Sequence, residues 1–148
     1  MTYENVVVGS DGSATAELAV TSAAEVAANH GARLVIVTAY TPRRDDTARQ
    51  STVPDDIRWA VTDVNQAEER VRRGRQLASE SGVTRTVTHA IAGSAADVLL
   101  DAAESFSADL IVVGSKGLTR TAGAILGSVA AAVVHHAPCD VMIVKTTD

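Results

Sequence analysis

Residues 109–128 read DLIVVGSKGLTRTAGAILGS, and their glycine spacing is the first feature of this chain that could do chemistry. An apolar run stops at Gly114; Gly117 follows after two residues, and Gly127 and Ser128 after nine more. Glycine lets the backbone approach a ligand closely, and consecutive N–H groups ahead of a helix form a cradle for an anion. The spacing predicts a phosphate-binding loop; a simple turn before a helix is the alternative.

A second glycine- and serine-rich loop, GSDGS at residues 9–13, follows the first apolar run of the chain. The Asp11 carboxylate can accept hydrogen bonds from ribose hydroxyls, or it can cap the helix that follows. Lys116 in the other loop could direct a positive charge at phosphate, although exposed loop lysines are common. A carboxylate in one loop and an N–H cradle in the other make a nucleoside phosphate a coherent ligand.

The elements that must position these loops alternate along the chain as short β-branched runs and longer alanine-rich segments. We expect strands at residues 4–10, 32–40, 83–93, 108–115 and 139–146. We expect helices at residues 13–31, 54–81, 94–107 and 122–136, the third of them capped by Ser94. Residues 41–56 are polar and hold two of the three prolines, so they predict a long, mobile surface loop.

This order, βαβαβαβαβ, predicts one α/β domain over residues 1–148, with a parallel sheet between helices on both faces. Ligands of such sheets bind beyond the carboxyl ends of the strands, where the strand order reverses. If the first strand is central, that point lies between the two glycine loops. Residues more than a hundred positions apart in the sequence are therefore expected to meet.

Composition excludes several classes of function. The net charge of −5 argues against a general binder of nucleic acid or anionic membranes. No apolar run approaches the length of a membrane span, and residues 1–20 carry no secretory signal pattern. The single cysteine, Cys139, fits a reducing compartment, so we expect a soluble cytoplasmic protein.

Motifs for catalysis are absent from the sequence. It contains no Walker motif, no dinucleotide fingerprint and no nucleophile elbow. The adjacent His135 and His136 point in different directions on a helix, so they do not predict a metal site. We expect no catalytic residues and no metal ligands, and at most a slow ATPase.

The spacing G-x2-G-x9-G-S is similar to the ATP-binding signature of the universal stress protein family. The stretches VVVGSDGS and LGSVAAAVVHHAPCDVMIVK resemble the same family, and the resemblance covers nearly the whole chain. It implies a five-stranded parallel sheet of order 3-2-1-4-5. One departure is Ala130, where some ATP-binding members carry a hydroxyl residue.

The resemblance also implies a ligand and its contacts. Adenine would lie at the ends of the first two strands, ribose on Asp11 and Gly114, and the phosphates on the glycine loop. The implied nucleotide-binding residues are Gly9, Ser10, Asp11, Ala39, Val113, Gly114, Lys116, Gly117, Gly127, Ser128 and Val129.

The function expected is a stress-response regulatory protein that binds ATP, alone or with Mg²⁺, with little or no hydrolysis. AMP or cAMP as the ligand, and a nucleotide-free interaction module, remain alternatives. An ATP pyrophosphatase-like enzyme is less favoured, because 148 residues leave no room for its substrate domain.

The last strand predicts a partner. In the implied sheet order, Asp140–Lys145 is an edge, and its VMIV core carries no charge. An uncovered apolar edge promotes association, and a two-fold dimer would pair it. We expect a homodimer through this edge, as the resemblance also implies.

Overall fold

The computed structural model describes residues 2–11, 14–40, 54–115 and 126–145, with the backbone alone for residue 14 and residues 54–64. The strands are β1 (Asn5–Gly9), β2 (Arg33–Tyr40), β3 (Thr86–Ala92), β4 (Leu110–Gly114) and β5 (Asp140–Val144). The helices are α1 (Ala14–His30), α3 (Pro54–Glu80), α4 (Ala95–Ser105) and α5 (Ser128–His136). Most of the predicted loop at 41–56 lies outside the described residues, and its last three residues already belong to α3.

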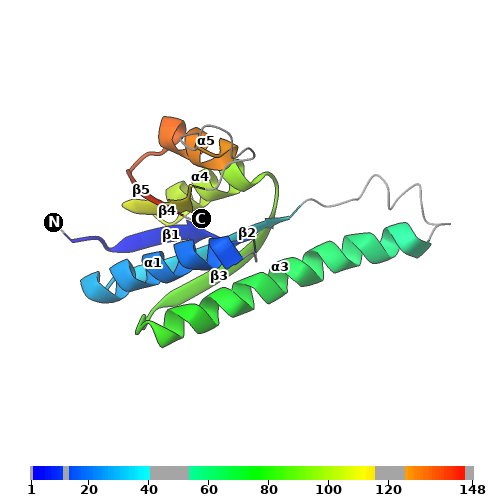
Figure 1. The fold of residues 1–148 in the computed structure, drawn as a ribbon, viewed down its shortest axis with the longest axis horizontal. Coiled ribbons are helices and arrows are strands. Elements are labelled where there is room, and N and C mark those ends of the chain that lie inside the picture. Colours follow the sequence, from blue (N-terminus) through cyan, green and yellow to red (C-terminus); the bar gives the residue numbers. More distant parts are fainter. Residues whose placement is uncertain (1, 12–13, 41–53, 116–125, 146–148) are drawn as a thin grey trace.

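The sheet has the predicted order β3-β2-β1-β4-β5, and every neighbouring pair is parallel. Helices α1 and α3 cover one face, and α4 and α5 cover the other (Figure 1). Each connection crosses from one strand to a parallel one through a helix, so all strands end on the same side of the molecule. The α/β fold predicted from the element order is confirmed.

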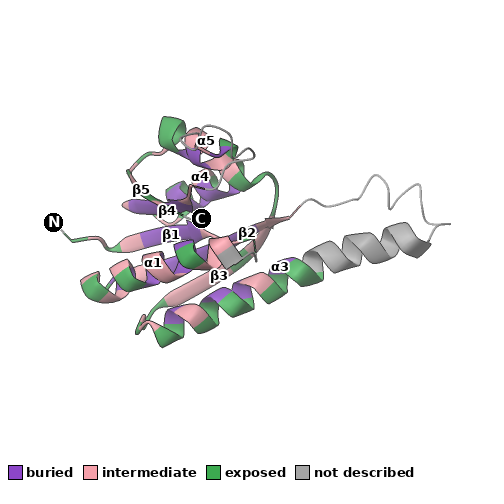
Figure 2. Cartoon of the chain, in the orientation of Figure 1, coloured by how far each residue is buried: buried purple, intermediate pink, exposed green. Residues whose placement is uncertain are grey.

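The central strand β1 is buried on both faces. Val6, Val7 and Val8 are each 0% exposed. In Figure 2, the buried residues, in purple, include much of β1. Val6 and Val8 pack into a core with α1, whereas Val7 packs into a second core with α4 and α5. This alternation explains the continuous apolar run in the sequence, because a strand covered on both sides has no polar face.

Polar groups close the amino ends of the strands. The Asp109 carboxylate accepts hydrogen bonds from the N–H groups of Glu4 and Asn5, each at 2.9 Å. Arg33 Nε donates to Asn5 Oδ1 at 3.0 Å, and its Nη2 donates to the carbonyl of Phe106 at 3.3 Å. These bonds join the amino ends of β1 and β2 to the turn that precedes β4.

Two helix starts determine where backbone N–H groups are exposed. The Ser94 hydroxyl accepts from the N–H of Asp97 at 3.3 Å, which confirms the predicted cap of α4. Helix α5 begins at Ser128. The sequence predicted a helix from residue 122, and this prediction is wrong for Leu126 and Gly127, which are not helical. Gly127 has an extended backbone, φ −62° and ψ 159°, and is the N-cap; residues 122–125 lie outside the described residues. A glycine favours such a boundary because it is a poor helix former.

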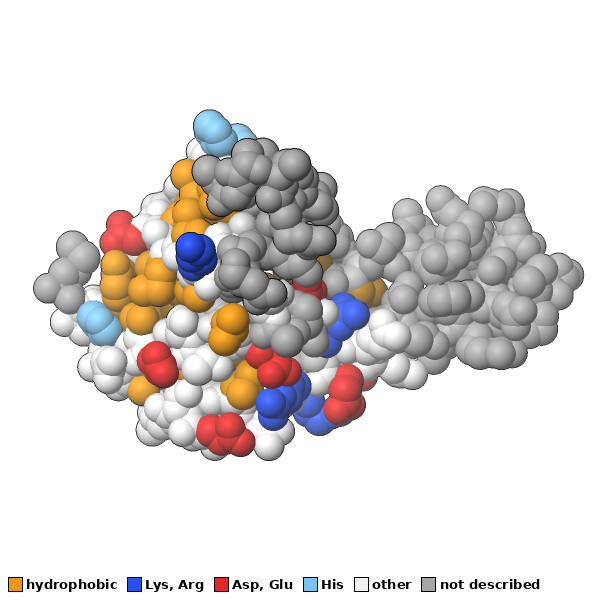
Figure 3. Space-filling model, in the orientation of Figure 1, with side chains coloured by type: hydrophobic (Ala, Val, Ile, Leu, Met, Phe, Trp, Pro, Cys, Tyr) orange, Lys and Arg blue, Asp and Glu red, His pale blue; other side chains and the backbone are white. Residues whose placement is uncertain are grey.

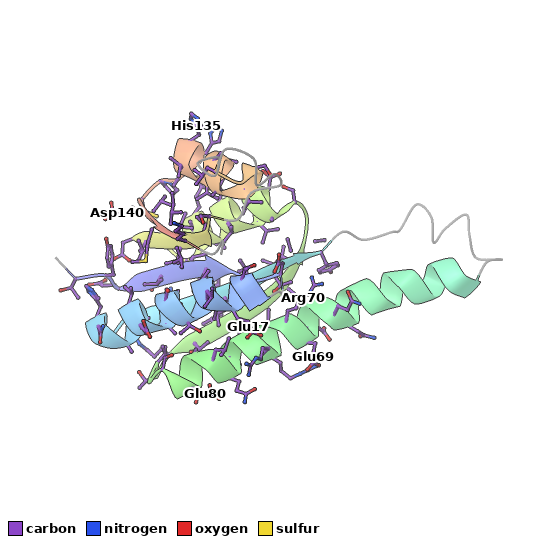
Figure 4. All side chains as sticks on the ribbon, in the orientation of Figure 1. Glu17, Glu69, Arg70, Glu80, His135 and Asp140 are labelled. Carbon is purple, nitrogen blue, oxygen red and sulfur yellow. The ribbon has the colours of Figure 1, made fainter. Side chains whose placement is uncertain are left out.

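The longest helix, α3, packs closely on β2. A Cβ added at Gly74 would lie 3.1 Å from Ile36 Cγ2, so the glycine allows this close approach. The Arg73 Nε lies 3.1 Å from Glu17 Oε2 and joins α3 to α1, and Glu80 is the last residue of α3 (Figure 4). Across the described residues, no helix combines the length and apolar character needed to cross a membrane.

We expect Gly74→Val to lower the free energy of unfolding by about 1–3 kcal/mol, because overpacking forces Ile36 and the helix apart. Ser79→Val is the matched control, since Ser79 is exposed on the same helix. Urea denaturation of both variants checks this. A Gly74→Val midpoint equal to that of Ser79→Val would contradict the close contact.

Candidate functional site

A pocket of about 350 Å³ lies at the carboxyl ends of β1, β2 and β4. The sheet order reverses at this position, since β1 continues to β2 on one side and lies beside β4 on the other. The walls come from the strand ends and from the first two turns of three helices. The lining residues are Gly9, Ser10, Asp11, Thr15, Ala16, Ala19, Val37, Ala39, Ala95, Val98, Leu99, Val113, Gly114, Ser128, Val129 and Ala130.

The pocket brings together most of the residues that the sequence nominated. Eight of the eleven line it: Gly9, Ser10, Asp11, Ala39, Val113, Gly114, Ser128 and Val129. Gly127 is buried beside the pocket as the N-cap of α5 without lining it. Lys116 and Gly117 lie outside the described residues. The two loops expected to meet are therefore neighbours in space, although their part in binding a ligand stays a prediction.

On the β1 side, the backbone and an apolar side chain define the wall. The N–H of Ser10 donates to the carbonyl of Val37 at 2.9 Å, so the chain follows β2 for one residue beyond the end of β1. An added Cβ at Gly9 would lie 3.2 Å from Leu99 Cδ2. The absence of a side chain at Gly9 allows Leu99 of α4 to sit directly against the strand end.

On the β4 side, the start of α5 supplies hydrogen-bond donors. The first helical bond runs from the N–H of Ala131 to the carbonyl of Gly127 at 2.9 Å. In an α-helix, the N–H groups before that bond have no acceptor within the helix, and the helix dipole places partial positive charge there. Ser128, Val129 and Ala130 occupy these positions and line the pocket. This wall suits an anion.

Half of the wall was not predicted. Thr15, Ala16 and Ala19 of α1, Val37 of β2, Ala95, Val98 and Leu99 of α4, and Ala130 of α5 complete it. The topology held a signal for α4: it connects β3 to β4, so it must cross β2 and β1 on the face opposite α1. Small and aliphatic side chains predominate, which suits a flat apolar ring.

Asp11 carries the one ionisable side chain in the described wall of the pocket, and it is exposed. Elsewhere among the described residues, no three His, Cys, Asp or Glu side chains gather as metal ligands would. The half-buried Cys139 lies away from the pocket, and burial raises the pKa of its thiol, with a smaller contribution from Asp140. The pocket can bind an anion and an apolar ring, but its described wall holds no base beside a nucleophile.

The fold and the pocket define a class: a small parallel α/β protein with a ligand site at the switch point of its sheet. The universal stress protein family model matches residues 2–145. The universal stress protein Rv1636 of Mycobacterium tuberculosis is 39% identical over 145 residues, which cover 98% of each chain. This chain belongs to the universal stress protein family.

Solved structures of the family share the fold and include nucleotide complexes. A universal stress protein in complex with cAMP is 34% identical, with a TM-score of 0.75, covering 99% of this chain and 100% of that one. The universal stress protein from Archaeoglobus fulgidus in complex with dAMP is 25% identical, with a TM-score of 0.69, covering 98% and 100%. Nucleotide binding is therefore a property of these relatives.

We expect Cys139 to react slowly with a thiol reagent such as Ellman's reagent at pH 8. A raised pKa lowers the fraction of reactive thiolate at any pH below it. Unfolding in urea should accelerate the reaction, and Cys139→Ser should abolish it. Equal rates in folded and unfolded protein would show that burial does not protect the thiol.

Proposed function

We propose that this protein is a stress-response regulator that binds ATP in the pocket at the carboxyl end of the sheet, with little or no hydrolysis. The observation that carries the proposal is the meeting of the Asp11 loop and the start of α5 around one cavity. The whole chain, residues 1–148, acts as a single domain in this proposal. A cytoplasmic location fits the single cysteine.

The proposed pose follows the chemistry of the wall. Adenine lies against the apolar side of the pocket, between Ala39 and the start of α4. The Asp11 carboxylate accepts hydrogen bonds from the ribose beside Gly114. The phosphates, with or without Mg²⁺, take the N–H groups and hydroxyl at Ser128, and Gly117 and Lys116 complete the loop. Slow turnover follows, because Asp11 is engaged with ribose and the described wall offers no other base.

Calorimetric titration with ATP tests the proposal. We expect Asp11→Ala to weaken binding at least tenfold, since hydrogen bonds to charged groups contribute about 1.5–3 kcal/mol. We expect Ser128→Ala to weaken it less, because the backbone donors remain. Asp101→Ala, which removes an exposed carboxylate from α4, should bind as the wild type does. Wild-type affinity in Asp11→Ala would contradict the assignment of the site.

A cyclic or single phosphate is a second candidate ligand. A relative that is 34% identical was solved in complex with cAMP, and Ala130 adds no second hydroxyl beside that of Ser128 in the first turn of α5 for additional phosphate oxygens. Mass spectrometry of nucleotide released from the purified, denatured protein distinguishes ATP, AMP and cAMP. A nucleotide-free interaction module would release none and bind none.

The proposal includes a homodimer through β5. This strand is an edge of the sheet, and Ile143 is 41% exposed on it. Met142 and Val144 of the same strand and the nearby Tyr3 are partly buried against the core on the α1 face, and apolar side chains gather on this part of the surface (Figure 3). The other edge, β3, is different, because Arg75 donates to the Thr86 carbonyl at 3.4 Å and occupies its outer side. An apolar, unblocked edge favours pairing with a second copy.

We expect the wild type to sediment as a dimer at micromolar concentration and Ile143→Lys to sediment as a monomer. A charge in the paired edge would have to be desolvated or would disrupt the strand pairing. Leu18→Lys is the control, since Leu18 is 52% exposed on α1. A monomeric wild type, or a dimeric Ile143→Lys, would exclude this interface.

A further inference from the structure

Thr38 is an unusual residue for its position in β2. It is 1% exposed, and it is the one buried polar side chain among the described residues. The residues before it, Val35, Ile36 and Val37, are apolar and buried, as a strand covered on both faces requires. Valine has nearly the same shape as threonine, so packing alone does not require a hydroxyl here.

The Thr38 hydroxyl has a defined partner in the neighbouring loop. Its Oγ1 donates to the carbonyl oxygen of Ser10 at 2.9 Å. The N–H of the same Ser10 donates to the carbonyl of Val37, also at 2.9 Å. Both backbone polar groups of Ser10 are therefore bound to β2. The first bond extends the strand pairing, and the second comes from a side chain.

These two bonds fix the direction in which the chain leaves β1. Gly9 ends the strand, and both the N–H and the carbonyl of Ser10 are hydrogen-bonded to β2. Asp11 follows and lines the pocket. Val37 and Ala39 line the pocket on either side of Thr38, whose side chain alternates to the other face of the sheet. Thr38 itself is not one of the lining residues, so it contacts the loop without forming part of the described pocket wall.

We propose that Thr38 is a positioning residue for ribose recognition: its hydroxyl holds Ser10 so that the Asp11 carboxylate faces the sugar. This inference rests on the proposed function and adds the hydroxyl group that holds the loop of the proposed site in position. A carboxylate on a loop recognises two adjacent hydroxyls only if its backbone is held in place before the ligand arrives. Thr38 supplies this constraint without touching the ligand.

The nucleotide-free protein provides the first test. We expect Thr38→Val to speed hydrogen exchange of the Ser10 amide at least tenfold, while the Val7 amide in the strand interior is unchanged. Thr38→Ser, which keeps the hydroxyl, should restore protection. Thr88→Val is the matched control: Thr88 also makes a side-chain hydrogen bond, in which its Oγ1 accepts from Arg75 Nη2 at 3.0 Å, but it lies on edge strand β3. Unchanged exchange at Ser10 in Thr38→Val overturns the inference.

The second test compares ATP with 2′,3′-dideoxy-ATP, which lacks the ribose hydroxyls. We expect Thr38→Val to bind ATP about tenfold more weakly, with less than a twofold change for the dideoxy analogue. Thr38→Ser and Thr88→Val should keep the wild-type ratio of the two affinities. An equal loss for both nucleotides, or no loss for either, overturns the role in ribose recognition. A wild type that binds neither nucleotide rejects the proposed function, while the exchange experiment still decides whether Thr38 holds the loop.

Discussion

β1 pairs in parallel with β2 on one side and with β4 on the other, and the position of the pocket follows from this double pairing. After β1 the chain passes through α1 to β2, whereas after β4 it passes through α5 to β5 on the other side of the sheet. These two connections diverge and leave a gap between the ends of β1 and β4. Full burial of Val6, Val7 and Val8 makes this strand costly to displace. The loops around the gap are thereby attached to the most rigid part of the sheet.

A site built on this gap uses the backbone more than side chains. The strand ends supply Gly9 and Gly114, and the start of α5 supplies N–H groups at Ser128 and Val129. Such donors are fixed by the fold itself and carry no rotamer entropy, so little order has to be created when a ligand binds. Among the described residues of the pocket wall, Asp11 carries the one ionisable side chain.

Apolar runs and glycine spacing are local signals, and they predicted the parallel α/β sheet and the two loops at its carboxyl end. The strand order and the eight residues of the pocket wall were implied by the resemblance to the universal stress protein family. Sequence reasoning missed what only packing determines. Val98 and Leu99 line the pocket from α4, a helix remote in sequence from β1, and the approach of Leu99 to Gly9 depends on the crossover in three dimensions. Thr38 gave no signal either, since threonine, like valine, is enriched in strands. The start of α5 was placed too early, because the apolar period continues through the residues before its glycine cap.

The charge of the described wall limits which nucleotides it can hold unaided. Asp11 is acidic, and the described part of the wall contains no Lys or Arg side chain. The positive potential there comes from the start of α5, equivalent to roughly half a charge. That compensates much of a single phosphodiester such as that of cAMP, but only a small part of a triphosphate. The proposed binding of ATP therefore requires further positive charge, which a bound Mg²⁺ or the sequence between Ser115 and Leu126, where Lys116 and Arg120 occur, would supply.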